Sequence, residues 1–295
     1  MNDQAQALRQ LVTSRAGSPE PADKKSAARI ITVSSGKGGV GKSNFTLNFA
    51  IALKSLGRKV LIFDADIGMA NIDVLMGVRP RYSLYHLLKG ERDILEIIEL
   101  GAGGVPFIAG GSGMADLFNL SENDLDYFTS QIEAVSEDMD YIIFDTGAGL
   151  SKETLKFITA ADDCLVVTTP EPTSITDAYA LVKVVHGMDR ELSFRLVVNR
   201  VSGEHEARQV ADKISLVARQ FLNVEIPLLG YLSDDAHVMQ AVKKQIPFTA
   251  AFPGCTAARD IQRLAMKYMD VPQARKNDTL SGIKGFMHKW LRRTT

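Results

Sequence analysis

The sequence predicts a doubly wound α/β fold, in which a mostly parallel sheet is flanked by helices. The first observation is that short, almost continuously apolar runs alternate with segments of helical periodicity along most of the chain. Such runs suit strands of a sheet that is covered on both faces. The second observation is a glycine-rich loop that ends in Lys-Ser, between the first apolar run and the first helical segment. That order is typical of a strand, a turn and a helix whose N-terminus faces an anion.

The predicted elements follow from the spacing of apolar residues. Strands are expected where apolar, often β-branched residues form an unbroken run, at 30–33, 60–63, 105–109, 141–144, 165–168, 196–198 and 228–232. Helices are expected where apolar residues recur every three or four positions, at 44–56, 122–135, 175–186, 206–221, 235–243 and 256–269. The glycine clusters at 101–104 and 110–113 lack the lysine and serine of a second phosphate loop, so we expect turns there.

The loop at 34–44, SSGKGGVGKSN, has the spacing of a P-loop, GxxxxGKS. In this pattern backbone N–H groups surround the phosphates, the lysine neutralises them and the hydroxyl binds magnesium. The expected nucleotide-binding residues are Gly36, Lys37, Gly38, Gly39, Val40, Gly41, Lys42, Ser43 and Asn44. The pattern needs only Lys42, so Lys37 requires a separate explanation.

Three aspartates directly follow predicted strands. Asp64 and Asp66 come after KVLIF, and Asp145 comes after DYIIF. The carboxyl ends of parallel strands meet at one edge of the sheet, beside the P-loop. Phosphoryl transfer needs magnesium held against the phosphates and a positioned water. A single aspartate at a strand end is usually a turn residue, but three beside a P-loop favour a role in catalysis.

The composition limits the other classes of function. The chain has 295 residues, of which 45% are hydrophobic, so it can bury a full core. Its 34 Lys+Arg and 35 Asp+Glu leave no overall field for nucleic acid or membrane, so such binding would need a local site. Cys164 and Cys255 form no paired motif, which fits a reducing cytoplasm. No apolar run reaches the roughly 18 residues of a spanning helix, so a cytoplasmic protein is expected.

Three motifs resemble the deviant Walker A, switch I and switch II of the MinD/ParA class of P-loop ATPases: GKGGVGKS, FDADIGMANIDVLMG and FDTGAG. The resemblance implies ATP, ADP and Mg²⁺ as ligands. It also implies that Lys37 reaches across a face-to-face homodimer to the partner's phosphates, as an arginine finger does. Asn199, in VVNR, corresponds to a position that often reads adenine. Where the family usually has DxPAG, this chain has Thr146 and Gly147 before Ala-Gly.

The same resemblance assigns the remaining roles. Lys42 would bind the β- and γ-phosphates, and Ser43 would bind magnesium. Asp64 would hold magnesium through water, and Asp145 would be the switch II carboxylate near the metal. Asp66 would position the attacking water. The expected catalytic residues are therefore Lys37, Lys42 and Asp66.

The two ends differ from the middle, and the chain is expected to divide into a segment at 1–12, a polar linker at 13–29, an ATPase domain at 30–269, a linker at 270–279 and an amphipathic helix at 280–293. The front segment resembles the DQAxxLR motif of the FlhG family of flagellar number regulators, also called YlxH or FleN. The matching residues are Asp3, Gln4, Ala5, Leu8 and Arg9. The resemblance implies that they contact FlhF, a signal-recognition-type GTPase, and that the flagellar C-ring proteins FliM, FliN or FliY are further partners.

The segment at 280–293 has two distinct faces when it is plotted at ~100° per residue. Its apolar side includes Ile283, Phe286, Met287, Trp290 and Leu291, and its opposite side includes Lys284 and Lys289. Such a helix is too short to span a bilayer but suits the plane of an anionic membrane. We expect it to lie outside the core as a membrane-targeting helix. The alternative is a helix that packs the same apolar stripe on the core.

These features predict an ATP-driven switch that dimerises, lies on the inner face of the cell membrane when ATP-bound, and regulates the number and placement of flagella. A MinD-type division-site ATPase is an alternative, which the long front extension disfavours. A ParA-type partition ATPase would bind DNA in a strongly salt-dependent way, and no sequence-specific binding of nucleic acid is expected. A carrier related to the nitrogenase iron protein would need paired cysteines near the dimer axis, and no such motif is present.

Overall fold

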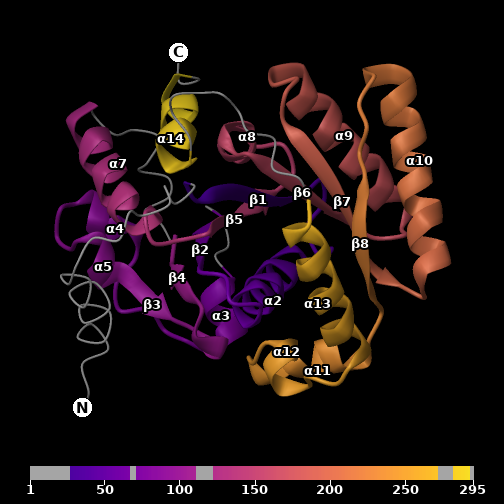
Figure 1. The fold of residues 1–295 in the computed structure, drawn as a ribbon, viewed down its shortest axis with the longest axis horizontal. Coiled ribbons are helices and arrows are strands. Elements are labelled where there is room, and N and C mark those ends of the chain that lie inside the picture. The colour runs from indigo at the N-terminus through magenta and orange to yellow at the C-terminus, as the bar shows by residue number, and fades with distance from the viewer. Residues whose placement is uncertain (1–26, 67–70, 111–121, 272–281, 293–295) are drawn as a thin grey trace, which may run out of the picture.

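The computed structural model describes residues 27–66, 71–110, 122–271 and 282–292. Within them the chain forms an eight-stranded sheet with the order β3-β4-β2-β5-β1-β6-β7-β8 (Figure 1). The strands are β1 (Arg29–Ser35), β2 (Val60–Ala65), β3 (Ile98–Leu100), β4 (Pro106–Ile108), β5 (Tyr141–Ala148), β6 (Asp163–Thr168), β7 (Ser193–Val201) and β8 (Leu228–Ser233). Neighbouring strands are parallel except β3 and β4, which are antiparallel. The predicted doubly wound α/β fold is confirmed.

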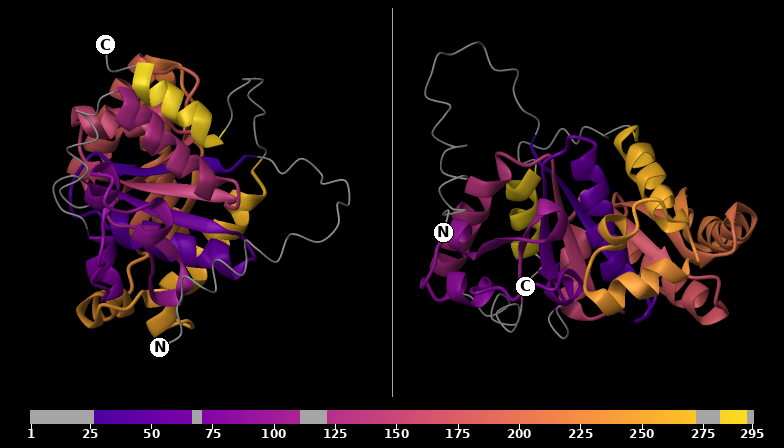
Figure 2. Two further views of the ribbon diagram at one scale, coloured as in Figure 1. Left: turned by 90° about the vertical axis from the view of Figure 1, so that its left-hand side faces the viewer. Right: turned by 90° about the horizontal axis from the view of Figure 1, so that it is seen from below.

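Helices cover both faces of the sheet (Figure 2). One face carries α2 (Lys42–Ser55), α3 (Ile72–Met76), α11 (Ala236–Lys244), α12 (Phe248–Ala251) and α13 (Thr256–Met269). The other carries α4 (Leu84–Leu88), α5 (Ile94–Ile97), α7 (Glu122–Ser136), α8 (Lys152–Ala160), α9 (Pro172–Met188), α10 (Glu204–Leu222) and α14 (Gly282–Arg292). A 3₁₀ turn, η1, spans Ala102–Gly104.

The pleat of the strands explains why these strands are apolar throughout. In β5, Ile143 packs in the cluster on the α2 side, whereas Ile142 and Phe144 pack in the cluster on the α14 side. Successive side chains of a strand point to opposite faces, so a strand covered on both faces needs apolar residues at every position. This is the reason that unbroken apolar runs predicted the strands.

Strand β1 lies between β5 and β6, and β2 lies on the far side of β5. The chain therefore leaves β1 toward one half of the sheet for β2 and later enters the other half with β6. Ligands of doubly wound sheets bind outside the carboxyl ends of the strands where the order reverses in this way. The P-loop and the carboxyl ends of β2 and β5 all lie there.

The sequence did not predict the edge strand β3 or the helix α8. β3 is three residues long and pairs only with β4. α8 is nine residues long and starts at the cap Ser151, whose hydroxyl accepts a hydrogen bond from the N–H of Thr154 at 3.1 Å. Elements this short carry too few turns of periodicity to be distinguished from loops.

The C-terminal helix α14 is docked on the sheet face between α7 and α8, which differs from the expectation that it lies outside the core (Figure 1). Ile283, Phe286, Met287 and Trp290 are each at most 3% exposed. The ring of Phe286 stacks on Phe144 with 4.7 Å between centroids. The same apolar stripe that suits a membrane is thus covered by the protein's own aromatic side chains.

None of the helices in the described residues combines the length and the apolar character needed to cross a bilayer.

Candidate functional site

The P-loop joins β1 to α2, and its glycines adopt conformations that few other residues could. Gly39 and Gly41 have φ of 80° and 92°, in the left-handed region. A Cβ on Gly36 would lie 2.1 Å from the carbonyl oxygen of Asp177 on α9. The loop is therefore packed closely on α9, and it delivers α2 with its N-terminus at the edge of the sheet. That N-terminus favours a bound anion.

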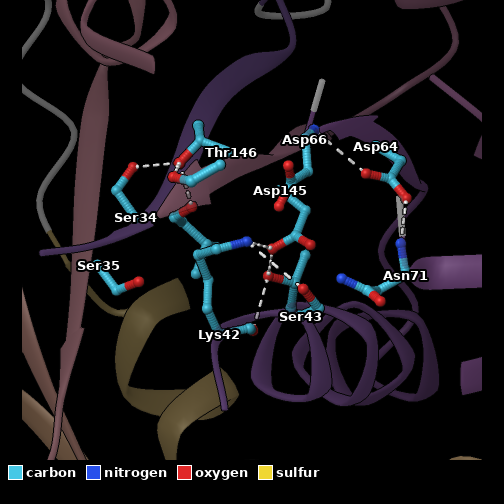
Figure 3. A network of polar contacts seen from close by, with 12 residues as sticks. Ser34, Ser35, Lys42, Ser43, Asp64, Asp66, Asn71, Asp145 and Thr146 are labelled. Atoms are coloured by element: carbon cyan, nitrogen blue, oxygen red, sulfur yellow. Dashed lines mark hydrogen bonds and ion pairs between the residues drawn. The ribbon is translucent and has the colours of Figure 1, made fainter. Parts of the chain in front are cut away.

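Lys42 is buried at the start of α2 and contacts switch II (Figure 3). Its Nζ donates to Oδ1 of Asp145 at 2.9 Å, and the hydroxyl of Thr46 donates to the same oxygen at 2.8 Å. Oδ2 of Asp145 is buried and has no hydrogen-bond partner among the described residues. This second oxygen is therefore available to a cation.

Asp64 lies beside Asp145, because β2 and β5 pair these two residues directly. Its side chain is 1% exposed, and Oδ2 accepts hydrogen bonds from the N–H groups of Asn71 at 3.1 Å and Ile72 at 3.2 Å. Burial first, and then the neighbouring Asp145, raise the pKa of Asp64 to about 7. Asp64 thus also holds the backbone of switch I at the point where α3 begins.

This arrangement fits a divalent cation. Two buried carboxylates lie side by side at the mouth of the P-loop, and Lys42 is directly paired with only one of them. The hydroxyl of Ser43 is within 3.4 Å of the Lys42 ammonium, so it belongs to the same cluster. Oxygen ligands of this kind suit Mg²⁺. The three expected metal ligands, Ser43, Asp64 and Asp145, are therefore brought together.

Asp66 follows β2 and lies against switch II. A Cβ added to Gly147 would be 3.6 Å from Oδ1 of Asp66, so the carboxylate lies next to that glycine's backbone. Residues 67–70, in the middle of switch I, lie outside the described residues. The position of Asp66, between the ends of β2 and β5, suits a group that acts on a water near the terminal phosphate.

Lys37 contacts the start of α9 in the single chain. Its Nζ donates to Oε2 of Glu171 at 3.2 Å and to the hydroxyl of Thr173 at 3.1 Å. The lysine side chain is 41% exposed and that of Glu171 is 57% exposed. An exposed ion pair contributes only about 0–1 kcal/mol. The contact therefore does not prevent Lys37 from reaching a second chain.

Asn199 contacts the P-loop itself. Its Nδ2 donates to the carbonyl of Val40 at 2.7 Å, and its Oδ1 accepts from the N–H of Arg200 at 3.0 Å. In this structure the amide therefore supports the phosphate loop, whereas the family resemblance implied contact with adenine. Each amide atom keeps capacity for one further hydrogen bond.

Sequence reasoning missed several residues of the site. Thr46 lies one helical turn after Lys42, and this spacing could have placed it beside the lysine. Glu171 and Thr173 lie just after β6, at the same edge of the sheet as the P-loop. The expected FlhF-contacting residues, Asp3 to Arg9, lie outside the described residues, as does the side chain of Leu291.

Comparisons with known proteins identify nucleotide-binding relatives of this chain. A family model described as the CobQ/CobB/MinD/ParA nucleotide binding domain matches residues 31–248. The antiactivator FleN of Pseudomonas aeruginosa is 37% identical over 242 residues, covering 81% of this chain and 85% of FleN. The flagellum site-determining protein YlxH of Helicobacter pylori is 37% identical over 268 residues, covering 90% of each chain. The solved structure of the cell division ATPase MinD from Pyrococcus furiosus is 26% identical, with a TM-score of 0.67, covering 82% of this chain and 98% of that one.

Proposed function

We propose that the chain is an ATP-driven switch that regulates the number and placement of flagella. It belongs to the CobQ/CobB/MinD/ParA family of nucleotide-binding proteins and is an ATPase of the MinD/ParA class. The ATPase function is supported by the position of Asp64, Asp66 and Asp145, which lie beside the P-loop at one edge of the sheet. The observation that carries the flagellar role is the similarity to YlxH, which extends over nine-tenths of both chains.

The residues of the site supply complementary parts of hydrolysis. The backbone N–H groups of the P-loop and the N-terminus of α2 bind the phosphates, and Lys42 moves from Asp145 to the β- and γ-phosphates. Asp66 orients the attacking water. Ser43 and Asp145 would hold Mg²⁺ directly and Asp64 would hold it through water, and the bound cation would supply charge neutralisation for phosphoryl transfer.

Lys37 completes the site of a second copy of the chain. Its cis contacts with Glu171 and Thr173 are exposed and replaceable. In an ATP-bound homodimer its ammonium would neutralise charge at the partner's phosphates, and the transition state would then form only in the dimer. ATP binding and dimerisation are in this way coupled, and hydrolysis returns the protein to single chains.

The partners follow from the two ends of the chain. FlhF would bind the segment containing Asp3 and Arg9, and the C-ring proteins FliM, FliN or FliY would be recruited by the ATP-bound dimer. An anionic inner membrane surface would bind α14. Because its apolar stripe is docked on the core, membrane binding requires undocking, and the buried residues Phe286 and Trp290 then change from core to membrane contacts. The basic residues Lys284 and Lys289 would face the lipid headgroups.

The test combines a deletion strain with a variant that separates binding from hydrolysis. Asp66→Ala should bind ATP, because Asp66 acts on water rather than on phosphate, but should hydrolyse it slowly and accumulate as a dimer in light scattering. The deletion should change the number of flagella per cell in electron micrographs, and wild type but not Lys42→Ala should restore it. Unchanged flagella together with misplaced septa would instead identify a division-site ATPase.

A further inference from the structure

Switch II leaves the regular sheet at one point. Toward β2 the pairing stays regular, with Asp145 opposite Asp64 and Thr146 opposite Ala65. Toward β1, Asp145 lies opposite Val33, but the next pair is Ala148 with Ser35. β5 therefore carries one residue more than β1 in this interval, which is a bulge. A bulge of this kind disrupts the backbone ladder and re-aims the side chains beside it.

The hydroxyl of Thr146 occupies this bulge. Thr146 is fully buried, and its Oγ1 lies 3.1 Å from the carbonyl of Val33 and 3.1 Å from the carbonyl of Gly147, so its single proton can be donated to either. The hydroxyl of Ser34, on β1, is 2.9 Å from the same oxygen (Figure 3), and it is the donor to Thr146 whenever Thr146 donates to one of these carbonyls. A side chain thus replaces the backbone contact that the bulge interrupts, and it ties switch II to the strand that leads into the P-loop.

The residue after Thr146 makes such a tie necessary. Gly147 stands where the resembling family usually has a proline, whose ring would restrict the backbone. Glycine removes that restriction. An added Cβ would make a tight contact with Oγ1 of Thr154 at 3.2 Å and an ordinary van der Waals contact with Oδ1 of Asp66 at 3.6 Å. Because glycine leaves the backbone free at this point, switch II needs another restraint.

We infer that Thr146 is a positioning residue for ATP hydrolysis. Its hydroxyl fixes the bulge, and the bulge sets both neighbours: the Asp145 carboxylate, which lies 2.9 Å from the Lys42 ammonium, and the Gly147 backbone, against which Asp66 lies. Without the hydroxyl, these groups lose their alignment with the P-loop while the loop itself stays intact. This inference rests on the proposed ATPase function.

The test is a pair of substitutions at this position with a matched control. Thr146→Val removes the hydroxyl and keeps the branched shape, whereas Thr146→Ser keeps the hydroxyl. Thr32→Val is the control, because Thr32 is also fully buried, lies on β1, and donates its hydroxyl to the carbonyl of Asp163 at 3.3 Å, away from switch II. The measurements are kcat and KM for ATP, the affinity for ADP, and the melting temperature of each variant.

Thr146→Val should lower kcat by about tenfold to a hundredfold, the loss that follows when catalytic groups are misplaced by about 1 Å. Its KM and ADP affinity should stay near wild type, because the P-loop is unchanged. Thr146→Ser should keep kcat near the wild-type value. Thr32→Val should lower the melting temperature without a loss of kcat comparable to that of Thr146→Val. If Thr146→Val does not melt cooperatively, Thr146→Ala replaces it.

Three results would overturn the inference: Thr146→Val with the wild-type kcat, Thr146→Ser as slow as Thr146→Val, or the same loss of kcat in Thr32→Val. Lys42→Ala separates these results from a failure of the proposed function. If Lys42→Ala is inactive, the P-loop function stands and only the role of Thr146 is wrong. If Lys42→Ala hydrolyses ATP at the wild-type rate, the proposed use of this P-loop is wrong, and the role of Thr146 falls with it.

Discussion

Asp64 and Asp145 lie side by side at the ends of adjacent strands, and Lys42 pairs directly with Asp145. The burial of Asp64 and the charge of Asp145 make ionisation of Asp64 costly, which is why its pKa is raised to about 7. A bound cation would offset that cost for both carboxylates. At the residue scale, the two carboxylates therefore lack a positive charge that a metal ion bound with the nucleotide would supply.

This charge balance predicts a pH dependence of stability in the metal-free protein. The pKa of Asp64 rises from 3.8 to about 7 on folding, so between these values the folded chain binds more protons than the unfolded chain. The contribution of Asp64 to stability is therefore present at low pH and is lost as pH rises through about 7. Asp64→Asn should remove this loss, and its melting temperature should fall less between pH 5 and pH 8 than that of wild type.

The control for Asp64→Asn is Asp212→Asn, an exposed aspartate on α10 that should leave the pH profile of melting as in wild type. Mg²⁺ and ATP should raise the melting temperature of wild type at pH 8 and should raise that of Asp64→Asn much less. Equal falls in melting temperature for wild type and Asp64→Asn would show that Asp64 does not carry this dependence.

Lys37 provides a second prediction at the residue scale. Lys37→Ala should weaken ATP-dependent dimerisation more than ATP binding to the single chain, because its charge acts in the partner's site. Lys42→Ala should abolish both, since it acts in its own site. Glu171→Gln removes the exposed ion pair of Lys37 and leaves its contact with Thr173. Dimerisation should therefore change by less than about fivefold, corresponding to an ion pair of about 0–1 kcal/mol. Light scattering and nucleotide titration measure the two steps. Wild-type dimerisation of Lys37→Ala would refute the action in trans.

At the scale of elements, α8 holds the C-terminal helix α14 together with α7. Phe157 of α8 lies 6.2 Å from the ring of Phe286 and 6.1 Å from the ring of Trp290. The Lys156 ammonium lies over the Trp290 ring, 5.5 Å from its centroid. The first turn of α8, at Thr154, is in turn next to Gly147 of switch II. One short helix thus contacts both the nucleotide site and the docked C-terminal helix.

The sequence predicted those elements whose signal is local and failed where the partner is distant in sequence. The P-loop and the strands β1, β2 and β5 were predicted because glycine spacing and unbroken apolar runs are visible within a short window. The docking of α14 was not, because an amphipathic stripe looks the same whether it meets a membrane or a core. The contacts of Lys37 with Glu171 and of Thr146 with Val33 depend on segments more than a hundred residues apart.

The contacts of α14 predict that α8 controls its release. Phe157→Leu should weaken docking by about 1 kcal/mol, as modest losses of core packing do, and this corresponds to roughly a fivefold larger undocked fraction. Sedimentation with anionic vesicles in the absence of ATP should rise accordingly. Phe194→Leu is the matched control, because Phe194 is equally buried but belongs to the cluster around α9 and α10. If both variants sediment alike, general instability rather than release of α14 explains the effect.

At the scale of the whole molecule, the nucleotide site and α14 lie at different places on one sheet. The site is at the carboxyl edge of β1, β2 and β5, whereas α14 covers one face of the same strands. A single released α14 carries few basic residues, and each contributes on the order of 1 kcal/mol near anionic lipid. A homodimer presents two such helices, so avidity would make membrane binding depend on ATP without any new contact.

This geometry gives the final prediction. Truncation after Asp278 removes α14 and should abolish ATP-dependent sedimentation with phosphatidylglycerol vesicles while ATP binding remains. Because truncation also exposes the apolar cluster around Phe144 and Phe157, the full-length double variant Lys284→Gln and Lys289→Gln is needed beside it. This variant keeps the apolar stripe, loses the exposed ion pair between Lys284 and Glu133 of α7 at 3.1 Å, and loses about 1 kcal/mol of lipid attraction per charge. Because loss of that ion pair can only ease undocking, weaker sedimentation with ATP would report the lost lipid attraction. If both proteins sediment as the wild type does, α14 is not the membrane anchor.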